Sequence, residues 1–226
     1  MTRTVDLVIP VKALPDAKTR LVATSGLRDH DRHRRAVLAL LTDTVAAALA
    51  AEPVRRVVVI TPDDHVADAA RTAGAEPLDD TTSGGLNAAI EHGERHLRAQ
   101  DPVVAIGALL ADLPALRPKE LAAAVRAARG GRAFCPDADG TGTTLLLGAE
   151  GGQLRPQFGP SSARAHQLSG AFLLHGPWPS LRRDVDTLSD LHAAADLGLG
   201  HHTTAMLATE LALAPVAAGG GYPRGA

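Results

Sequence analysis

Short apolar runs rich in Val and Ile alternate along the first 131 residues with longer stretches rich in Ala and Leu. The apolar runs have the length and β-branched composition of buried strands, whereas the longer stretches repeat apolar residues at helical spacing. The predicted strands are "VDLVIPV" (5–11), "RRVVVIT" (55–61), "AEPLDD" (75–80) and "VVAIGALL" (103–110). The predicted helices lie within residues 31–51, 63–75, 84–99 and 117–131. This alternation is typical of an α/β fold with a parallel sheet.

After Gly131 the pattern changes. Residues 132–148, "RAFCPDADGTGTTLLLG", predict a β-hairpin. A short helix is expected within 159–170, an apolar strand within 171–176, and an extended segment leading into a helix within 181–198. We therefore predict a Rossmann-like, mostly parallel sheet flanked by helices, with a β-hairpin insertion in the C-terminal half. Residues 1–214 would form a single domain and residues 215–226 a flexible tail.

The composition and net charge of the chain argue against several classes of protein. A net charge of −2 argues against nucleic acid as a partner, because the protein has no overall basic field. The single cysteine, Cys135, excludes a disulfide framework and an all-cysteine zinc site, and we expect it to be buried. No run of about 18 apolar residues predicts a membrane helix, and the first strand follows the start too closely for a signal peptide. We expect a cytoplasmic protein.

Three aspartates carry the most specific chemical signal. Asp112 directly follows a predicted central strand, so it is either the N-cap of the next helix or a metal ligand at the carboxyl end of the sheet. Asp184 and Asp186 are two residues apart, which places both carboxylates on one side of an extended chain. Such oxygen ligands suit Mg²⁺. Alternatively, Asp186 and Thr187 cap the following helix, and Asp184 pairs with Arg182 or Arg183.

Two further segments suggest nucleotide contacts. Lys12, Lys18 and Arg20 follow the first strand, where the first βα loop of such sheets meets a nucleotide, although the P-loop spacing is absent. Gly84 and Gly85 precede a helix, and glycines there allow a ligand to approach the backbone N–H groups. A solvated basic loop and a plain loop-to-helix junction are the alternatives. The amide of Asn87 could read the edge of a base.

The C-terminal half offers groups for an anionic substrate. The segment from Asp137 lacks the Glu that an EF-hand has at its twelfth position, so its glycines indicate a tight turn. Thr143 and Thr144 begin the next strand, from which a hydroxyl could reach a substrate. Gly159 and Ser162 begin the short helix and could hold a carboxylate or phosphate, or serve only as a cap.

Six ordered motifs resemble the CofC/FbiD family: "IPVKALPDAKTRL", "GGLNAAI", "ADLPAL", "DADGTGTTLL", "FGPSSARAH" and "LRRDVDT". Members of that family are phosphoenolpyruvate or 2-phospho-L-lactate guanylyltransferases of coenzyme F-420 biosynthesis, within the MobA-like nucleotidyltransferases. The resemblance spans residues 5–197. One departure is Ala111, where the wider superfamily often has Gly before the metal-binding aspartate.

The resemblance implies a set of site residues. Asp112, Asp184 and Asp186 would be catalytic and hold two Mg²⁺ ions. The three-carbon phosphate would contact Thr144, Gly159 and Ser162. The GTP phosphates would lie along Lys12, Lys18 and Arg20, with Lys12 also catalytic, and the guanine would lie near Gly84, Gly85 and Asn87.

The substrates implied are GTP and phosphoenolpyruvate, with 2-phospho-L-lactate or 3-phosphoglycerate as alternative acceptors. The product could be handed to the downstream deazaflavin transferase. Two other interpretations stay open from the residues alone. Asp184-Val-Asp186 also fits the D-x-D metal motif of a glycosyltransferase, and the fold alone would fit a non-catalytic nucleotide-binding regulator.

Overall fold

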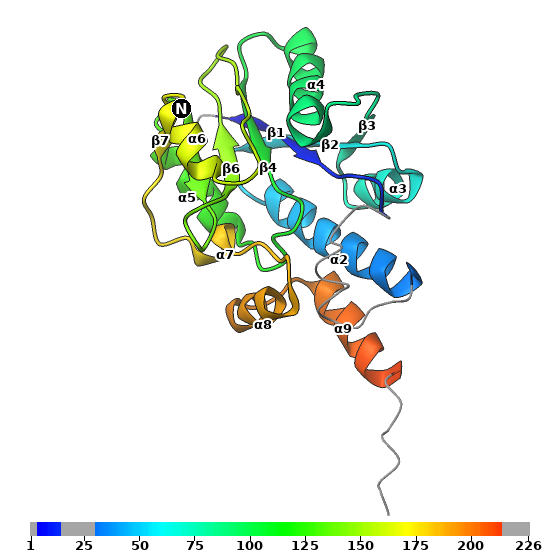
Figure 1. Cartoon of the computed structure of the whole chain (residues 1–226). Helices are drawn as coiled ribbons and strands as arrows, with labels where there is room; N and C mark the ends of the chain where they lie inside the picture. Colours follow the sequence, from blue (N-terminus) through cyan, green and yellow to red (C-terminus); the bar gives the residue numbers. More distant parts are fainter. Residues whose placement is uncertain (1–3, 15–29, 214–226) are drawn as a thin grey trace, which may run out of the picture.

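The structure of the protein is a computed structural model, and residues 4–14 and 30–213 are described (Figure 1). Its strands form one sheet in the order β3-β2-β1-β4-β6-β5-β7. They are β1 (Val5–Pro10), β2 (Val54–Thr61), β3 (Glu76–Asp79), β4 (Ala105–Leu109), β5 (Ala133–Pro136), β6 (Thr143–Leu147) and β7 (Phe172–Leu173). Among these strands only β6 runs opposite to its neighbours, so the predicted mostly parallel sheet is confirmed.

Helices cover both faces of the sheet because the strands between them are apolar on both sides. The helices are α2 (His30–Leu49), α3 (Asp64–Thr72), α4 (Gly85–Gln100), α5 (Pro118–Ala127), α6 (Ser162–Leu168), α7 (Pro179–Arg182), α8 (Leu188–Leu197) and α9 (His201–Leu213). In β1, Leu7 and Ile9 face the core shared with α2, whereas Val8 faces the core shared with α4. Figure 1 shows α2 and α4 on opposite sides of the sheet. No helix within the described ranges is both long and apolar enough to span a bilayer.

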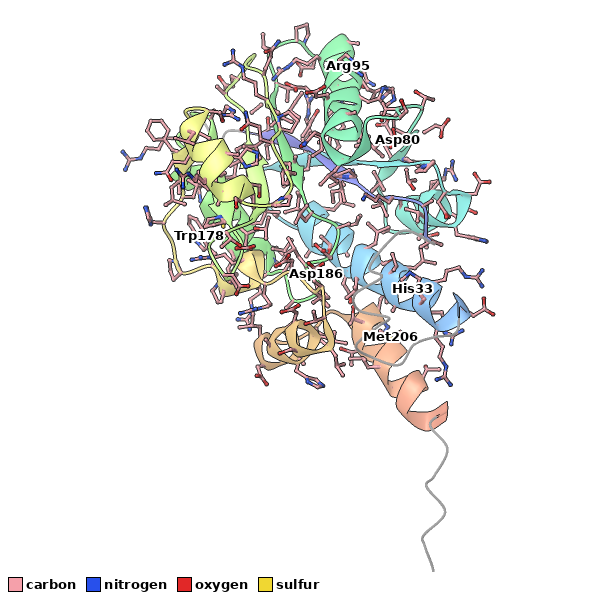
Figure 2. The ribbon with its side chains drawn as sticks, viewed as in Figure 1. His33, Asp80, Arg95, Trp178, Asp186 and Met206 are labelled. Carbon is pink, nitrogen blue, oxygen red and sulfur yellow. The ribbon has the colours of Figure 1, made fainter. Side chains whose placement is uncertain are left out.

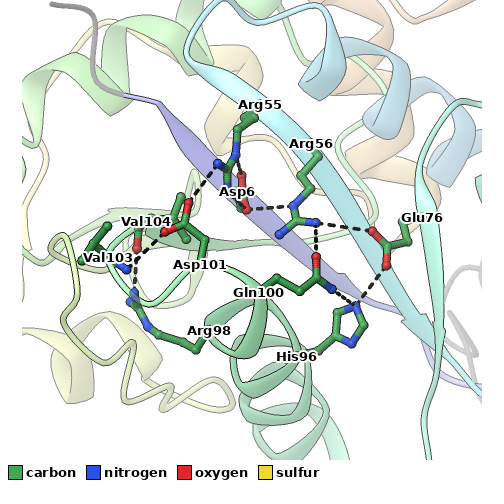
Figure 3. Close-up of polar contacts among 10 residues, drawn as sticks. All are labelled: Asp6, Arg55, Arg56, Glu76, His96, Arg98, Gln100, Asp101, Val103 and Val104. Atoms are coloured by element: carbon green, nitrogen blue, oxygen red, sulfur yellow. Dashed lines mark hydrogen bonds and ion pairs between the residues drawn. The ribbon is translucent and has the colours of Figure 1, made fainter.

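The amino-terminal ends of β1 and β2 are joined by ion pairs around one buried aspartate (Figure 3). Asp6 is fully buried in β1. Arg55 donates to both of its carboxylate oxygens at 2.7 Å, and Arg56 donates to one of them at 2.8 Å. A buried carboxylate without such partners would be strongly destabilising, so this network fixes the pairing of β1 with β2. It lies at the strand ends opposite to those that Asp112 follows.

Most predicted elements are confirmed, and the differences lie near the C-terminus. The hairpin is present, with Phe134 of β5 paired to Leu146 of β6 in antiparallel register. The strand expected within 171–176 is only Phe172–Leu173, and the segment expected to be extended from 181 begins with the short helix α7. The tail expected at 215–226 lies outside the described residues.

Helix α9 was not anticipated, because its start depends on a residue far away in the sequence. The carboxylate of Asp43, in α2, accepts hydrogen bonds from the backbone N–H groups of His202 and Thr203, at 3.0 and 2.7 Å. An aspartate that accepts from the first turn supplies the cap that α9 lacks in its own sequence.

Candidate active site

Asp112 lies just beyond β4 and is held by hydrogen bonds from two other parts of the chain. Its side chain is buried, with 8% exposure. Its carbonyl oxygen accepts from the Val185 N–H at 3.0 Å, and the next N–H, of Leu113, donates to the hydroxyl of Thr44 at 3.0 Å. Helix α5 begins later, at Pro118, and its N-cap is Arg117. The alternative in which Asp112 caps that helix is therefore wrong.

Asp184 and Asp186 lie on the segment between α7 and α8, and another residue caps α8. Thr187 is the N-cap, and it forms a reciprocal capping box with Asp190. The backbone N–H of Asp186 also donates to Asp190, at 3.2 Å. Thr187 therefore caps the helix, as the alternative of a cap at Asp186 and Thr187 expected, and its partner in the capping box is Asp190. Of the two nearby arginines, Arg182 donates to the carbonyl of Asp137, and Arg183 lies 3.9 Å from Asp190.

The three predicted metal ligands converge. Asp112, Asp184 and Asp186 each offer a carboxylate oxygen, and these oxygens all lie within 4.8 Å of one another. Figure 2 shows Asp186 near the middle of the molecule, close to the helices of the C-terminal segment. Like charges so close repel each other unless a cation or proton lies between them. A donor set made only of carboxylate oxygens fits a hard divalent cation such as Mg²⁺.

A cavity of about 670 Å³ opens beside this cluster. Asp184 and Asp186 line one side of it, and the β5–β6 hairpin and the start of α6 line another. The charged residues of the lining are Asp137, Asp139, Arg183, Asp184, Asp186 and Asp190. Among the described lining residues, one guanidinium therefore faces five carboxylates. Such a cavity would repel a polyanionic substrate unless bound cations offset the negative charge.

The residues expected to bind a three-carbon substrate are partly in this cavity. Gly159 and Ser162 both line it. Thr144 is fully buried, and its hydroxyl lies 3.5 Å from the carbonyl of Cys135. Its neighbour Thr143 lines the cavity, whereas Thr144 is not among the lining residues. Cys135 is buried as expected.

The expected nucleotide residues are described only in part. Lys12 is exposed just after β1, whereas Lys18 and Arg20 lie outside the described residues. Gly84 and Gly85 form the start of α4, as predicted. A Cβ at Gly84 would lie 2.5 Å from the Cβ of Ala88, and Gly85 has a φ of +72°, so both positions require glycine.

Asn87 has a structural partner that the sequence did not reveal. Its side-chain oxygen accepts from the Phe158 N–H at 2.8 Å, and its side-chain nitrogen donates to the Phe158 carbonyl at 3.0 Å. The amide thus binds both backbone groups of one residue. It fixes the loop before Gly159 to the first turn of α4, a role different from reading a guanine edge.

Sequence reasoning missed two supporting residues, Thr44 and His166. Both act through hydrogen bonds between elements, and such contacts leave no local pattern. The capping box of Thr187 and Asp190 was also not predicted, although it follows a local pattern, a Ser/Thr residue followed three positions later by an acidic one.

Comparison with known proteins gives the same assignment over most of the chain. Residues 5–166 match the sequence profile of the family described as "Guanylyl transferase CofC like". A phosphoenolpyruvate guanylyltransferase of Geodermatophilus obscurus is 50% identical over 204 residues, which cover 89% of this chain and 93% of that protein. One from Salinispora arenicola is 49% identical over 212 residues, covering 92% and 96%.

Among solved structures, a nucleotidyl transferase from Methanothermobacter is similar in fold, with a TM-score of 0.58 at 19% identity. The similarity covers 86% of this chain and 97% of that one. The overall α/β architecture is therefore shared with that protein. With a profile match over more than half of its length and relatives near 50% identity, this chain belongs to the CofC-like guanylyltransferase family.

Proposed function

We propose that the protein transfers GMP from GTP to phosphoenolpyruvate, giving enolpyruvyl-diphospho-guanosine and pyrophosphate, as a step of coenzyme F-420 biosynthesis. The observation that carries the proposal is the convergence of Asp112, Asp184 and Asp186 beside a large cavity. The names of the relatives support the choice of GTP and phosphoenolpyruvate as substrates.

In the proposed reaction, a phosphate oxygen of phosphoenolpyruvate attacks the α-phosphorus of GTP. The new P–O bond forms while the bond from the α-phosphorus to the bridging oxygen of the β-phosphate breaks, and pyrophosphate leaves. The attacking oxygen is already an anion, so the reaction needs no general base. This agrees with the cavity, whose described lining contains carboxylates, hydroxyls and one arginine but no histidine.

The main obstacle to such a reaction is charge. Two like charges about 4 Å apart cost roughly 4 kcal/mol at an effective dielectric constant near 20, and two polyanions present several such pairs. We propose that Asp112, Asp184 and Asp186 hold Mg²⁺, in two ions. When bound, Mg²⁺ would offset the repulsion between the substrates and stabilise the departing pyrophosphate.

The protein's own groups would orient the two substrates. Gly159 and Ser162 line the same cavity as Asp184 and Asp186, which suits them to the three-carbon acceptor. Lys12, Lys18 and Arg20 would lie along the GTP phosphates, and Gly84 and Gly85 would leave backbone N–H groups open to the nucleotide.

The test is a turnover assay on the whole chain with GTP and Mg²⁺, in which phosphoenolpyruvate, 2-phospho-L-lactate and 3-phosphoglycerate are compared in parallel. We expect pyrophosphate release to be fastest with phosphoenolpyruvate. A glycosyltransferase would instead release a nucleoside diphosphate from a nucleotide sugar, and a regulator would bind GTP without turnover. Handover of the product to the downstream transferase is a further expectation, which co-purification of the two enzymes would test.

A further inference from the structure

A buried histidine connects the wall of the cavity to the loop that carries Gly159. His166, in α6, is fully buried, and its Nδ1 lies 2.9 Å from the hydroxyl oxygen of Thr143. The hydroxyl of Ser162 lies 3.2 Å from that same oxygen. On the other side of the ring, Nε2 lies 2.9 Å from the backbone nitrogen of Gln157. Thr143 and Ser162 both line the cavity, whereas His166 lies behind them.

The partner of Nε2 determines which nitrogen carries the proton. The backbone N–H of Gln157 can only donate, so Nε2 must accept. A neutral imidazole with an accepting Nε2 has its proton on Nδ1, and that proton is donated to Thr143. Burial, with a smaller contribution from the charge of Arg132, lowers the pKa of His166 from 6.5 to about 4, so the ring is neutral near pH 7.

This tautomer decides what the two hydroxyls can offer to a ligand. Thr143 and Ser162 together have two hydroxyl hydrogens, and their mutual hydrogen bond uses one of them. Because Thr143 accepts from His166, the ring needs neither hydrogen, and one remains available on the cavity side. With the opposite tautomer, Thr143 would donate to Nδ1 and Ser162 to Thr143. Both hydrogens would then be used, and the cavity would face oxygen lone pairs that repel an anion.

We propose that His166 is a positioning residue for the three-carbon acceptor. As the Nδ1–H tautomer, it keeps one hydroxyl of the Thr143–Ser162 pair as a hydrogen-bond donor to the anionic part of that substrate. The same ring holds the Gln157 N–H and so fixes the loop just before Gly159. This inference rests on the proposed function and deepens it, because it identifies what sets the hydrogen-bonding polarity of the acceptor site.

The tautomer can be measured directly on the wild-type protein. Long-range ¹H–¹⁵N NMR spectra at pH 7 distinguish the two neutral forms of histidine, and a His166→Asn variant identifies the signal among the ten histidines. We expect Nδ1 to be protonated and Nε2 not. A ring protonated on Nε2 would overturn the inference, and this measurement does not depend on activity.

Kinetics tests the consequence for the substrate. Thr143→Val removes the hydroxyl at nearly constant shape, and Thr143→Ser restores it. Thr203→Val is the matched control: Thr203 is a fully buried threonine in α9, and its hydroxyl has no hydrogen-bond partner among the described residues. We expect Thr143→Val to raise the KM for phosphoenolpyruvate about tenfold or more, because a hydrogen bond to a charged group is lost. The KM for GTP in Thr143→Val, and both constants for Thr203→Val, should stay within about twofold of wild type, whereas Thr143→Ser should recover most of the affinity for phosphoenolpyruvate that Thr143→Val loses.

Two results would separate the possible failures. An unchanged KM for phosphoenolpyruvate in Thr143→Val, or equal increases for both substrates, would overturn the positioning role while GMP transfer still stands. If the wild-type protein released no pyrophosphate with any three-carbon phosphate, the proposed function would fail, and this inference with it.

Discussion

The backbone N–H of Val185 donates to the carbonyl oxygen of Asp112 at 3.0 Å. This single hydrogen bond joins the end of a central strand to the segment that carries the other two aspartates. Val185 is itself fully buried, so Asp184 and Asp186 on either side of it both turn away from the core. The arrangement of the three carboxylates is therefore set by the backbone, which should survive the loss of any one of them.

The first prediction concerns Asp112→Asn. Removing one carboxylate weakens cation binding, and the lost stabilisation of charge in the transition state corresponds to a fall in kcat of at least about hundredfold. The fold should persist, because Asp112 is held through its backbone oxygen. Steady-state pyrophosphate release and circular dichroism measure the two properties. Asp68→Asn, an exposed carboxylate in α3, is the control. Full activity of Asp112→Asn would contradict the metal site.

The second prediction concerns ligand-linked stability without turnover. A cation that binds only the folded state, at about a hundred times its Kd, stabilises it by about 2.7 kcal/mol. We therefore expect the Tm of the wild-type protein to rise when Mg²⁺ replaces a chelator, and expect little change in Asp186→Asn. Differential scanning calorimetry measures this shift. A wild-type Tm that does not respond to Mg²⁺ would mean that the three carboxylates do not hold the ion.

The third prediction concerns Thr44, whose hydroxyl accepts a hydrogen bond from the backbone N–H of Leu113, the residue after Asp112. Thr44→Val leaves the buried N–H of Leu113 without its acceptor, which should lower the free energy of unfolding by about 1–3 kcal/mol. The affinity for Mg²⁺ should also fall, by about tenfold, because Asp112, the proposed metal ligand that precedes Leu113, is no longer held in place by this hydrogen bond. Thr42→Val is the matched control, since among the described residues its hydroxyl bonds only to the carbonyl of Leu38 within the same helix. Urea denaturation and a Mg²⁺ titration of the activity measure both effects, and equal behaviour of the two variants would argue against a supporting role.

These residues also show which features of the site could be predicted from the sequence. The position of Asp112 after a strand, and the two-residue spacing of Asp184 and Asp186, are local patterns that indicated a metal site, and the family resemblance then implied that the three aspartates form it together. The hydrogen bond between Thr44 and Leu113 spans 69 residues, and that between Asn87 and Phe158 spans 71. Such contacts depend on which elements the fold packs together, so they cannot be predicted from periodicity or from a local motif.

The fourth prediction follows from the lowered pKa of His166. The pKa in the folded protein is about 4, below the ordinary value of 6.5, so the unfolded chain takes up a proton at a higher pH than the folded one. The stability that depends on neutral His166 is thus complete above pH 6.5 and is lost as the pH falls toward 4. The loss is about 3 kcal/mol. Urea denaturation at pH 7 and pH 4.5 should show a larger decrease for wild type than for His166→Asn. Parallel pH profiles would exclude this residue as the source.

The last prediction separates two roles for Asn87. If its amide read guanine, Asn87→Ala would reduce the preference for GTP over ATP. In the structure, the oxygen and the nitrogen of this amide are both hydrogen-bonded to the backbone of Phe158, the residue before Gly159. We therefore expect Asn87→Ala to raise the KM for phosphoenolpyruvate by about tenfold, since one anchor of the acceptor loop is lost, while the GTP-to-ATP ratio of kcat/KM stays unchanged.

Asn87→Asp sharpens the comparison between these roles. Its carboxylate can still accept from the Phe158 N–H, but its second oxygen would face the Phe158 carbonyl and repel it. Asn87→Asp should therefore also weaken acceptor binding, without altering base preference. Both variants are assayed with GTP and ATP at varied phosphoenolpyruvate. A change in the kcat/KM ratio in favour of ATP in either variant would mean that Asn87 contacts the nucleotide base. An effect confined to phosphoenolpyruvate would mean that the first turn of α4 positions the acceptor through a loop 71 residues further along the chain.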